Sequence, residues 1–287
     1  MQNSCIKIRW ITTVCFEITL PNGKVILLDP WTGHSESHPE FFADNGFTVD
    51  DFTGADYIFL SHTHFDHIDD AKAVSDKFKP DTYGGRIFVP ALSAYVFAQH
   101  YDIPYREVIP MFPNEKFDLD DITVEVLRCR HFGDKAAPVG PRPSKMFEGD
   151  DVDPQLAYMS AMGSIEEVDL AITLKENNFR ILILGGRIYK FNNIYEFCKT
   201  FNPNLVIRQV SPGFTPQDYA DIVSRYNCPI VFPSHHDTHH LEKASGMSFE
   251  AYFNEVNQIL ANKGSQARVV NAEPCKWYDV GCYCIKE

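Results

Sequence analysis

Residues 61–67 read Ser61-His62-Thr63-His64-Phe65-Asp66-His67, an H-x-H-x-D-H pattern. The pattern follows the apolar run 57–60, which predicts a buried strand, and it precedes residues 69–78, which have helical character. Imidazole nitrogens and carboxylate oxygens are typical ligands of zinc and similar divalent ions. In an extended chain His62 and His64 point to the same side, so both can bind one ion, while Asp66 and His67 can turn toward a second. A polar turn with chance histidines is the alternative, but four matching positions arise by accident in only roughly one in a thousand sequences of this length.

The rest of the chain divides into two patterns. Residues 6–20 and 25–29 flank Pro21-Asn22-Gly23-Lys24, whose Asn-Gly step favours a hairpin, so the first third is expected to contain antiparallel strands. Residues 204–271 alternate strand and helix patterns and are expected to form βα units. Further strands are predicted at 86–90, 117–130, 168–174, 179–185, 205–210, 229–233 and 267–271, and helices at 91–100, 193–201, 216–226 and 248–262.

The composition of the chain excludes several classes of protein. The chain has 287 residues, 44% of them hydrophobic, which allows a sizeable core. Lys and Arg total 26 against 39 Asp and Glu, a net charge of −13 that repels polyanions and disfavours nucleic-acid binding. We find no apolar run of the ~20 residues that a bilayer span needs and no export signal, and the eight cysteines are scattered. We therefore expect a cytoplasmic protein with reduced thiols and no membrane partner.

No linker divides the sequence, so residues 1–287 are expected to form a single domain with inserted loops near 31–55 and 132–165. The second loop is rich in proline and glycine, and long irregular segments in compact domains often serve as lids. Its apolar residues Met146, Phe147, Tyr158 and Met159 could cap a site or pack against another subunit, which leaves a homo-oligomer open.

The sequence resembles the metallo-β-lactamase superfamily of metal-dependent hydrolases, through residues 61–67 and through the run Ile26-Leu27-Leu28-Asp29-Pro30-Trp31. The latter run looks like the second strand of the ascorbate-6-phosphate lactonase-like branch. The resemblance extends from about residue 6 to about residue 271. It implies an α/β (α+β) fold, a four-layer αβ/βα sandwich that holds its metals in a cleft between two sheet edges.

The same resemblance implies a ligand set. His62 and His64 would bind the first ion together with His131, which follows a β segment, while Asp66 and His67 would bind the second. The last ligand of the second ion would be His235 in Pro233-Ser234-His235-His236-Asp237. His236 remains an alternative, although the P-x-H spacing favours His235.

One position departs from the family pattern. Family members usually carry Gly-Asp after a β run, and that Asp bridges the two ions, whereas this chain has Gly186 there. A carboxylate between two dications only ~3.5–4 Å apart offsets their repulsion, so its loss is expected to weaken at least one site. Asp134, Asp237 or a bridging hydroxide could compensate.

The expected function is a metal-dependent hydrolase of a small-molecule ester, lactone or phosphodiester, acting through a metal-activated water. One or two divalent ions are expected, zinc first, with manganese or iron as alternatives. Asp66 would bind an ion and accept a proton from the water, and Asp69 and Asp70 are the nearest carboxylates in sequence that could orient the imidazoles. Two alternatives stay open: a degenerate relative that binds a ligand or partner without catalysis, and an iron-dependent oxidoreductase in the same ligand cage.

Several further side chains admit both a functional and a structural interpretation. His34, His38, His239 and His240 could line the substrate mouth or lie in solvated turns, and Arg187 could contact a substrate anion or form a surface ion pair. Cys275, Cys282 and Cys284 lack the spacing of a zinc site.

Overall fold

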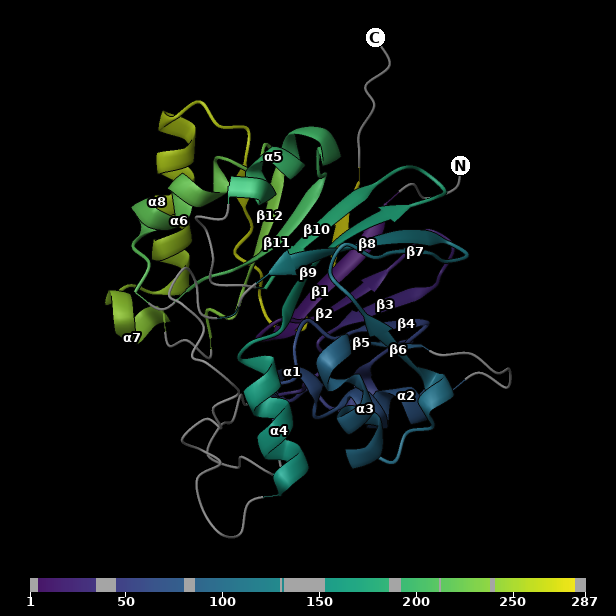
Figure 1. Ribbon diagram of the computed structural model, residues 1–287. Helices are drawn as coiled ribbons and strands as arrows, with labels where there is room; N and C mark the ends of the chain where they lie inside the picture. Colours follow the sequence, from purple (N-terminus) through teal and green to yellow (C-terminus); the bar gives the residue numbers. More distant parts are fainter. Residues whose placement is uncertain are drawn as a thin grey trace.

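The computed structural model describes residues 5–34, 45–79, 86–129, 131, 153–185, 192–211, 213–237 and 241–281. These residues form two mixed β-sheets with helices on their outer faces, which gives the layers helix, sheet, sheet and helix (Figure 1). The α/β sandwich that the sequence predicts is confirmed.

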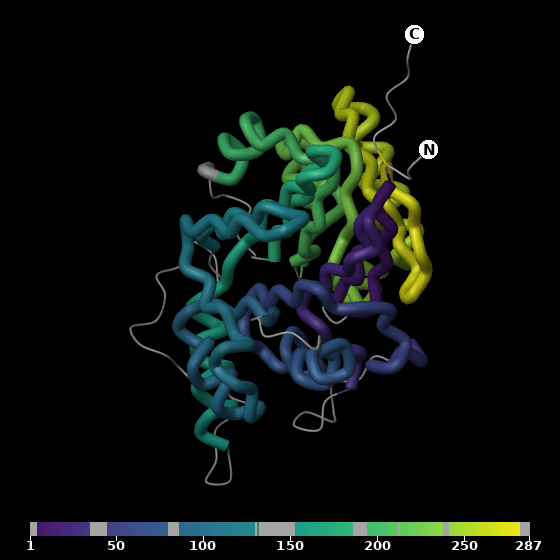
Figure 2. Tube along the Cα trace, turned by 90° about the vertical axis from the view of Figure 1, so that its right-hand side faces the viewer, coloured from purple at the N-terminus to yellow at the C-terminus, as the bar shows by residue number. Residues whose placement is uncertain are grey.

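The first sheet is built from both ends of the chain. Its strands are β1 (Ile6–Thr12), β2 (Cys15–Thr19), β3 (Val25–Leu28), β4 (Tyr57–Phe59), β5 (Ile87–Pro90), β6 (Val108–Met111) and β14 (Tyr278–Val280). They lie in the order β14-β1-β2-β3-β4-β5-β6. Pairs from β14 to β3 are antiparallel and pairs from β3 to β6 are parallel. The yellow C-terminal segment that contains β14 runs beside the purple N-terminal strands in Figure 2.

The second sheet repeats this arrangement. Its strands are β7 (Lys116–Asp118), β8 (Ile122–Cys129), β9 (Glu167–Leu174), β10 (Arg180–Leu184), β11 (Leu205–Gln209), β12 (Ile230–Ser234) and β13 (Arg268–Val269). The order is β13-β12-β11-β10-β9-β8-β7, with antiparallel pairs from β7 to β10 and parallel pairs from β10 to β13. Parallel neighbours need a crossover connection, and the predicted βα units of residues 204–271 supply it for the pairs from β11 to β13.

Helices cover the outer face of each sheet. The described helices are α1 (Phe65–Ile68), α2 (Ala71–Lys77), α3 (Ala91–His100), α4 (Pro154–Gly163), α5 (Asn192–Phe201), α6 (Pro216–Val223), α7 (Leu241–Ser245) and α8 (Phe249–Asn262), with 3-10 turns η1 (Val49–Asp51) and η2 (Tyr105–Glu107). In Figure 1, α5, α6 and α8 lie on the second sheet, and α1, α2 and α3 lie on the first.

Three apolar clusters hold these layers together. The cluster between the sheets contains Phe59 of β4 and Val124 of β8, and β8 alternates buried and half-buried residues over most of its length, as a strand with one covered face should. A second cluster joins Phe97 of α3 to the outer face of the first sheet. A third joins Val256 of α8 to the second sheet. Burial on both faces explains why the central strands are continuous apolar runs.

The structure differs from the sequence prediction in several places, among them residues 117–130, which form the two strands β7 and β8 rather than one segment. Residues 6–20 form two strands, because Thr13 takes a positive φ of 44° and turns the chain between β1 and β2. Part of the segment 132–165, predicted to be irregular, is the helix α4, whose first turn is capped by the Asp153 carboxylate. The strands β6 and β14 were not predicted; β14 has only three residues and gains its place by pairing with β1. Among the described helices, none combines the length and the apolar character that crossing a bilayer requires.

Candidate metal centre

Three strand ends from the two sheets converge on one place. The residues 61–64 follow β4, and α1 begins directly after them at Phe65. His131 lies two residues beyond β8, and His235 directly follows β12. Because β4 belongs to one sheet and the other two strands belong to its partner, the candidate site depends on how the sheets pack.

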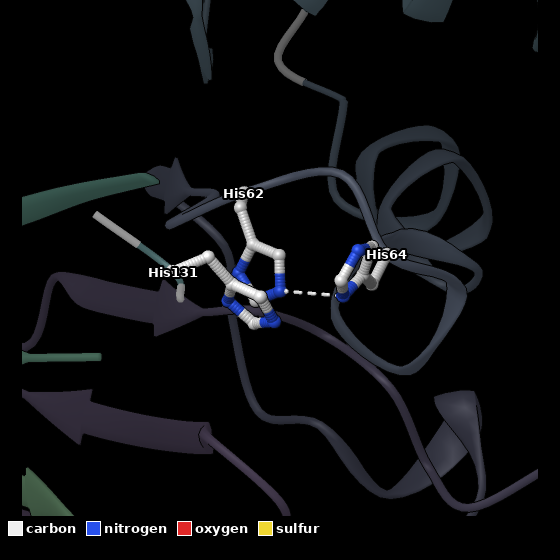
Figure 3. Close-up of side chains that lie close together, drawn as sticks. All are labelled: His62, His64 and His131. Carbon is white, nitrogen blue, oxygen red and sulfur yellow. Dashed lines mark hydrogen bonds between the residues drawn. The ribbon is translucent and has the colours of Figure 1, made fainter. Parts of the chain in front are cut away.

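His62, His64 and His131 form the first group, in which one ligand atom of each residue lies within 4.8 Å of the others. The Nε2 atom of His62 is 3.1 Å from Nδ1 of His64. The ring of His131 has its centroid 4.6 Å from both other rings. Figure 3 shows the three side chains turned toward one another, with the dashed line joining His62 and His64.

Hydrogen-bond partners indicate which ring nitrogen of each residue is left for an ion. The Nε2 atom of His64 lies 3.2 Å from the carbonyl oxygen of Ser160 in α4, and a carbonyl can only accept, so Nε2 carries the hydrogen and Nδ1 keeps its lone pair. His131 places Nδ1 3.1 Å from a carboxylate oxygen of Glu167, which likewise leaves Nε2 unprotonated. Nδ1 of His62 is 3.0 Å from the Ser61 hydroxyl. Such partners on the far nitrogen are the usual support of metal-binding histidines.

Asp66, His67 and His235 form the second group. The Nε2 atoms of His67 and His235 are 3.3 Å apart, and Oδ2 of Asp66 lies 3.4 Å from His235 Nε2 and 3.8 Å from His67 Nε2. Nδ1 of His67 donates to a carboxylate oxygen of Asp29 at 2.7 Å, so Nε2 is the nitrogen that faces the group and that an ion would bind in place of a proton.

The spacing of these atoms fits a divalent ion. In a tetrahedral centre with metal–nitrogen bonds of ~2.1 Å, neighbouring ligand atoms lie ~3.4 Å apart. The separations of 3.1 Å between His62 and His64, 3.3 Å between His67 and His235 and 3.4 Å between His235 and Asp66 are close to this value, and all other separations within each group stay below 4.8 Å. Imidazole nitrogens and a carboxylate oxygen are also the donor set that zinc and similar ions take. Both groups therefore fit an ion in geometry and in chemistry.

Charge is distributed unevenly over the two groups. Burial lowers the pKa of His62 well below its ordinary value, and the neighbouring His67 and His64 lower it further. Burial also lowers the pKa of His67, but the carboxylates of Asp66 and Asp29 outweigh it and raise this pKa to about 9. Burial thus keeps His62 of the first group neutral, while the carboxylates of Asp66 and Asp29 hold a proton on His67 of the second.

The structure brings together all six residues that the sequence singled out as ligands, three in each group. It also places His236 apart from both groups. The ring of His236 is buried and stacks on Trp10 with centroids 4.3 Å apart, with the edges of Phe249 and Phe253 against it. Burial lowers its pKa to about 4. His235, rather than His236, reaches the second group.

The carboxylates that contact the imidazoles are not those nearest in sequence. Asp69 accepts a hydrogen bond from the Tyr101 hydroxyl at 3.0 Å, and Asp70 accepts two from Thr32. Asp29 and Glu167 contact the ring nitrogens instead. Asp29 belongs to the run 26–31 that carried part of the family resemblance, whereas no local pattern marks Glu167.

Several candidates of the sequence analysis fall outside the described residues. Gly186 and Arg187 are among them, together with Asp134, His38, His239, His240, Met146, Phe147, Cys282 and Cys284. Asp237 is described, and its Oδ2 accepts hydrogen bonds from the Thr12 hydroxyl at 2.5 Å and the Thr13 amide at 3.1 Å. His34 is exposed, and its carbonyl accepts from the Trp31 indole.

Comparison with known proteins places the chain in a family. The family model described as a β-lactamase superfamily domain matches residues 24–236. A metal-dependent hydrolase of Myxococcus xanthus is 24% identical over 81% of this chain and 71% of its own length. A metal-dependent hydrolase of Polynucleobacter asymbioticus is 23% identical over 92% of this chain and 82% of its own length. The structure of Igni18, a metallo hydrolase from Ignicoccus hospitalis, shares the fold with a TM-score of 0.62 at 15% identity, covering 96% of this chain and 98% of that one. Because the family model covers well over half of the chain, the chain belongs to the metallo-β-lactamase superfamily.

Proposed function

We propose that this protein hydrolyses a small-molecule ester, lactone or phosphodiester, with divalent ions held by His62, His64 and His131 and by Asp66, His67 and His235. The chain is a metal-dependent hydrolase by family; the substrate class and the ligand roles are the proposed part. One observation carries the proposal: two groups of ligand atoms converge at adjoining strand ends with separations that suit tetrahedral coordination.

The two groups offer different chemistry to a substrate. A divalent ion bound here supplies a water of lowered pKa and an electrophile for a carbonyl or phosphoryl oxygen. Oδ2 of Asp66 faces the second group, and the Thr13 hydroxyl holds the Asp66 backbone by a hydrogen bond of 3.1 Å to its carbonyl oxygen. Asp66 is therefore fixed in place while its carboxylate stays available to bind an ion and to accept a proton.

Zinc is the proposed ion, with manganese or iron as alternatives, because five of the six ligand side chains are imidazoles and the sixth is a carboxylate. The net charge of −13 supports a small substrate over a nucleic acid. The six cysteines in the described part of the chain form no disulfide with one another, which supports a reducing compartment such as the cytoplasm. We also propose that residues 1–287 act as one domain, since each sheet supplies only part of the site.

A substrate panel tests the proposal. Metal-free protein is assayed with lactones, phosphodiesters and thioesters before and after addition of Zn²⁺ or Mn²⁺, and again with a chelator. We expect turnover of at least one substrate class that requires the metal, and we expect His131→Ala and His235→Ala each to abolish it. His34→Ala is the matched control, because this exposed histidine lies in neither ligand group, and it should keep wild-type turnover.

Two results would count against the proposal. Turnover that survives complete removal of metal would separate the activity from the ligand groups. Metal-loaded protein that turns over no member of the panel would reject these substrate classes. Turnover that requires iron and consumes oxygen would instead assign oxidative chemistry to the same ligands.

A further inference from the structure

The charge balance of the two groups is incomplete. Their six side chains contain a single carboxylate, that of Asp66, and the other five are imidazoles. Two dications in a mostly buried site need more negative charge than one carboxylate provides, because unbalanced buried charge is costly. Asp29 lies behind the second group, where it contacts His67. A corresponding carboxylate behind the first group is Glu167.

Glu167 reaches the first group from the neighbouring strand. It begins β9 and pairs with Cys129 at the end of β8, two residues before His131. Its side chain is buried, and Oε2 lies 3.1 Å from Nδ1 of His131. Since a carboxylate only accepts hydrogen bonds, His131 donates from Nδ1 and keeps Nε2 for an ion. Glu167 thus fixes both the orientation and the protonated nitrogen of His131.

The second carboxylate oxygen points to the end of β10. Oε1 of Glu167 lies 2.7 Å from the position that a Cβ atom on Gly185 would take. Real Cβ atoms do not approach an oxygen so closely. The Glu167 carboxylate can therefore lie where it does only because residue 185 is a glycine and has no Cβ atom. Ser61, whose hydroxyl lies beside His62 and Asp29, is 3.6 Å from the same Cβ position. The Glu167 carboxylate therefore lies between His131 and Gly185, which follows the end of β10.

We propose that Glu167 is the second carboxylate that the metal centre requires, a positioning residue that orients His131 and balances the charge of the bound ions, and that Gly185 is small in order to admit it. This inference rests on the proposed metal binding. A side chain from β9 thereby provides negative charge at Gly185, directly after the end of β10.

Metal binding to Glu167→Gln tests the proposal, because this substitution removes the charge with almost no change of shape. Zn²⁺ is titrated into metal-free protein against a chromophoric chelator, and melting temperatures are measured with and without Zn²⁺. We expect binding of at least one ion to weaken by about 10- to 100-fold and the rise in melting temperature on metal binding to shrink. Glu166→Gln is the matched control: Glu166 precedes Glu167 but accepts from the Leu92 amide at 2.9 Å instead, so zinc affinity should not change.

Gly185→Ala provides an independent variant that keeps the carboxylate and displaces it. Its methyl group would collide with Oε1, so we expect it to weaken zinc binding as Glu167→Gln does. Wild-type affinity in Glu167→Gln would overturn the role of Glu167 and leave the proposed function intact. An equal fall of the melting temperature with and without zinc would also overturn it, since that is the signature of a structural role alone. Failure of the wild-type protein to bind zinc would overturn both proposals.

Discussion

Replacing Asp29 with asparagine isolates the contribution of the carboxylate behind the second ligand group. The Asp29 carboxylate accepts three hydrogen bonds, from the Ser61 amide and hydroxyl at 2.6 Å each and from Nδ1 of His67 at 2.7 Å. An asparagine side chain has one acceptor oxygen and one donor group, so at least one of these donors would face another donor. The backbone of Asp29 has a positive φ of 41°, which asparagine adopts more readily than most residues. The change therefore tests the carboxylate rather than the turn.

The expected magnitude follows from these contacts. A hydrogen bond to a charged group contributes about 1.5–3 kcal/mol, and one buried donor is left without an acceptor, so we expect Asp29→Asn to lower the free energy of unfolding by about 3 kcal/mol. His67 also loses the partner that directs its Nε2 toward the metal group. Loss of such a partner typically weakens metal affinity by about 10- to 100-fold. Denaturant unfolding of metal-free protein and competition titration with Zn²⁺ measure the two effects.

Asp70→Asn is the matched control for this experiment. Asp70 also accepts from a backbone amide and a hydroxyl, both of Thr32, at 2.6 and 2.9 Å. Its substitution should destabilise the fold by a similar mechanism and leave zinc affinity close to that of the wild type. Equal zinc affinity in Asp29→Asn and wild-type protein would refute the reasoning, and so would equal losses of affinity in both variants.

Three further predictions concern packing and thiols. His236→Phe should keep the stacking on aromatic neighbours and remove two buried nitrogens that have no hydrogen-bond partner among the described residues, so unfolding free energy should stay level or rise by about 1 kcal/mol, with metal content unchanged. Gly163→Ala should cost about 1–3 kcal/mol, measured by denaturant unfolding, because its Cβ would lie 2.9 Å from Cδ2 and 3.0 Å from the backbone nitrogen of His64. Burial raises the pKa of Cys198 and Cys228 to about 12, so only about one in ten thousand of these thiols is a thiolate at pH 8. Iodoacetamide should therefore modify both cysteines only in denaturant, and mass spectrometry of the peptides would show this.

Each of these predictions has a clear contrary result. Loss of metal from His236→Phe would make that histidine a ligand. An unchanged stability of Gly163→Ala would mean that α4 can move away from His64 at no cost. Rapid labelling of Cys198 or Cys228 in folded protein would show that the second sheet opens readily on the side of α5 and α6.

Much of the candidate site could be predicted because its information is local. The pattern of residues 61–67 sets four of the six proposed ligand side chains within six residues, directly after an apolar strand. Hydrophobic periodicity gave α3 with the observed bounds and the parallel strands of the second sheet. The prediction that His131 and His235 join these residues came from the family resemblance. Nothing near either histidine in the sequence indicates which distant residues it will contact.

Residues that support the ligands could not be found in the same way. Glu167 lies 36 residues from the histidine that it contacts, and Asp29 lies 38 residues from His67. The carbonyl that orients His64 belongs to α4, in a segment whose prolines and glycines suggested irregular structure. Such contacts arise from the packing of strands and helices and leave no periodic signal along the chain. Proximity in sequence therefore pointed to Asp69 and Asp70, which make their hydrogen bonds elsewhere.

Metal content per chain tests the central claim most directly. Protein purified without chelator, and a second sample loaded with Zn²⁺ and desalted, are analysed by inductively coupled plasma mass spectrometry beside His131→Ala and His235→Ala. Two ligand groups predict about two divalent ions per wild-type chain after loading, and a loss of about one ion in each variant. Wild-type protein that retains essentially no metal after loading would contradict the assignment of these residues as a metal centre.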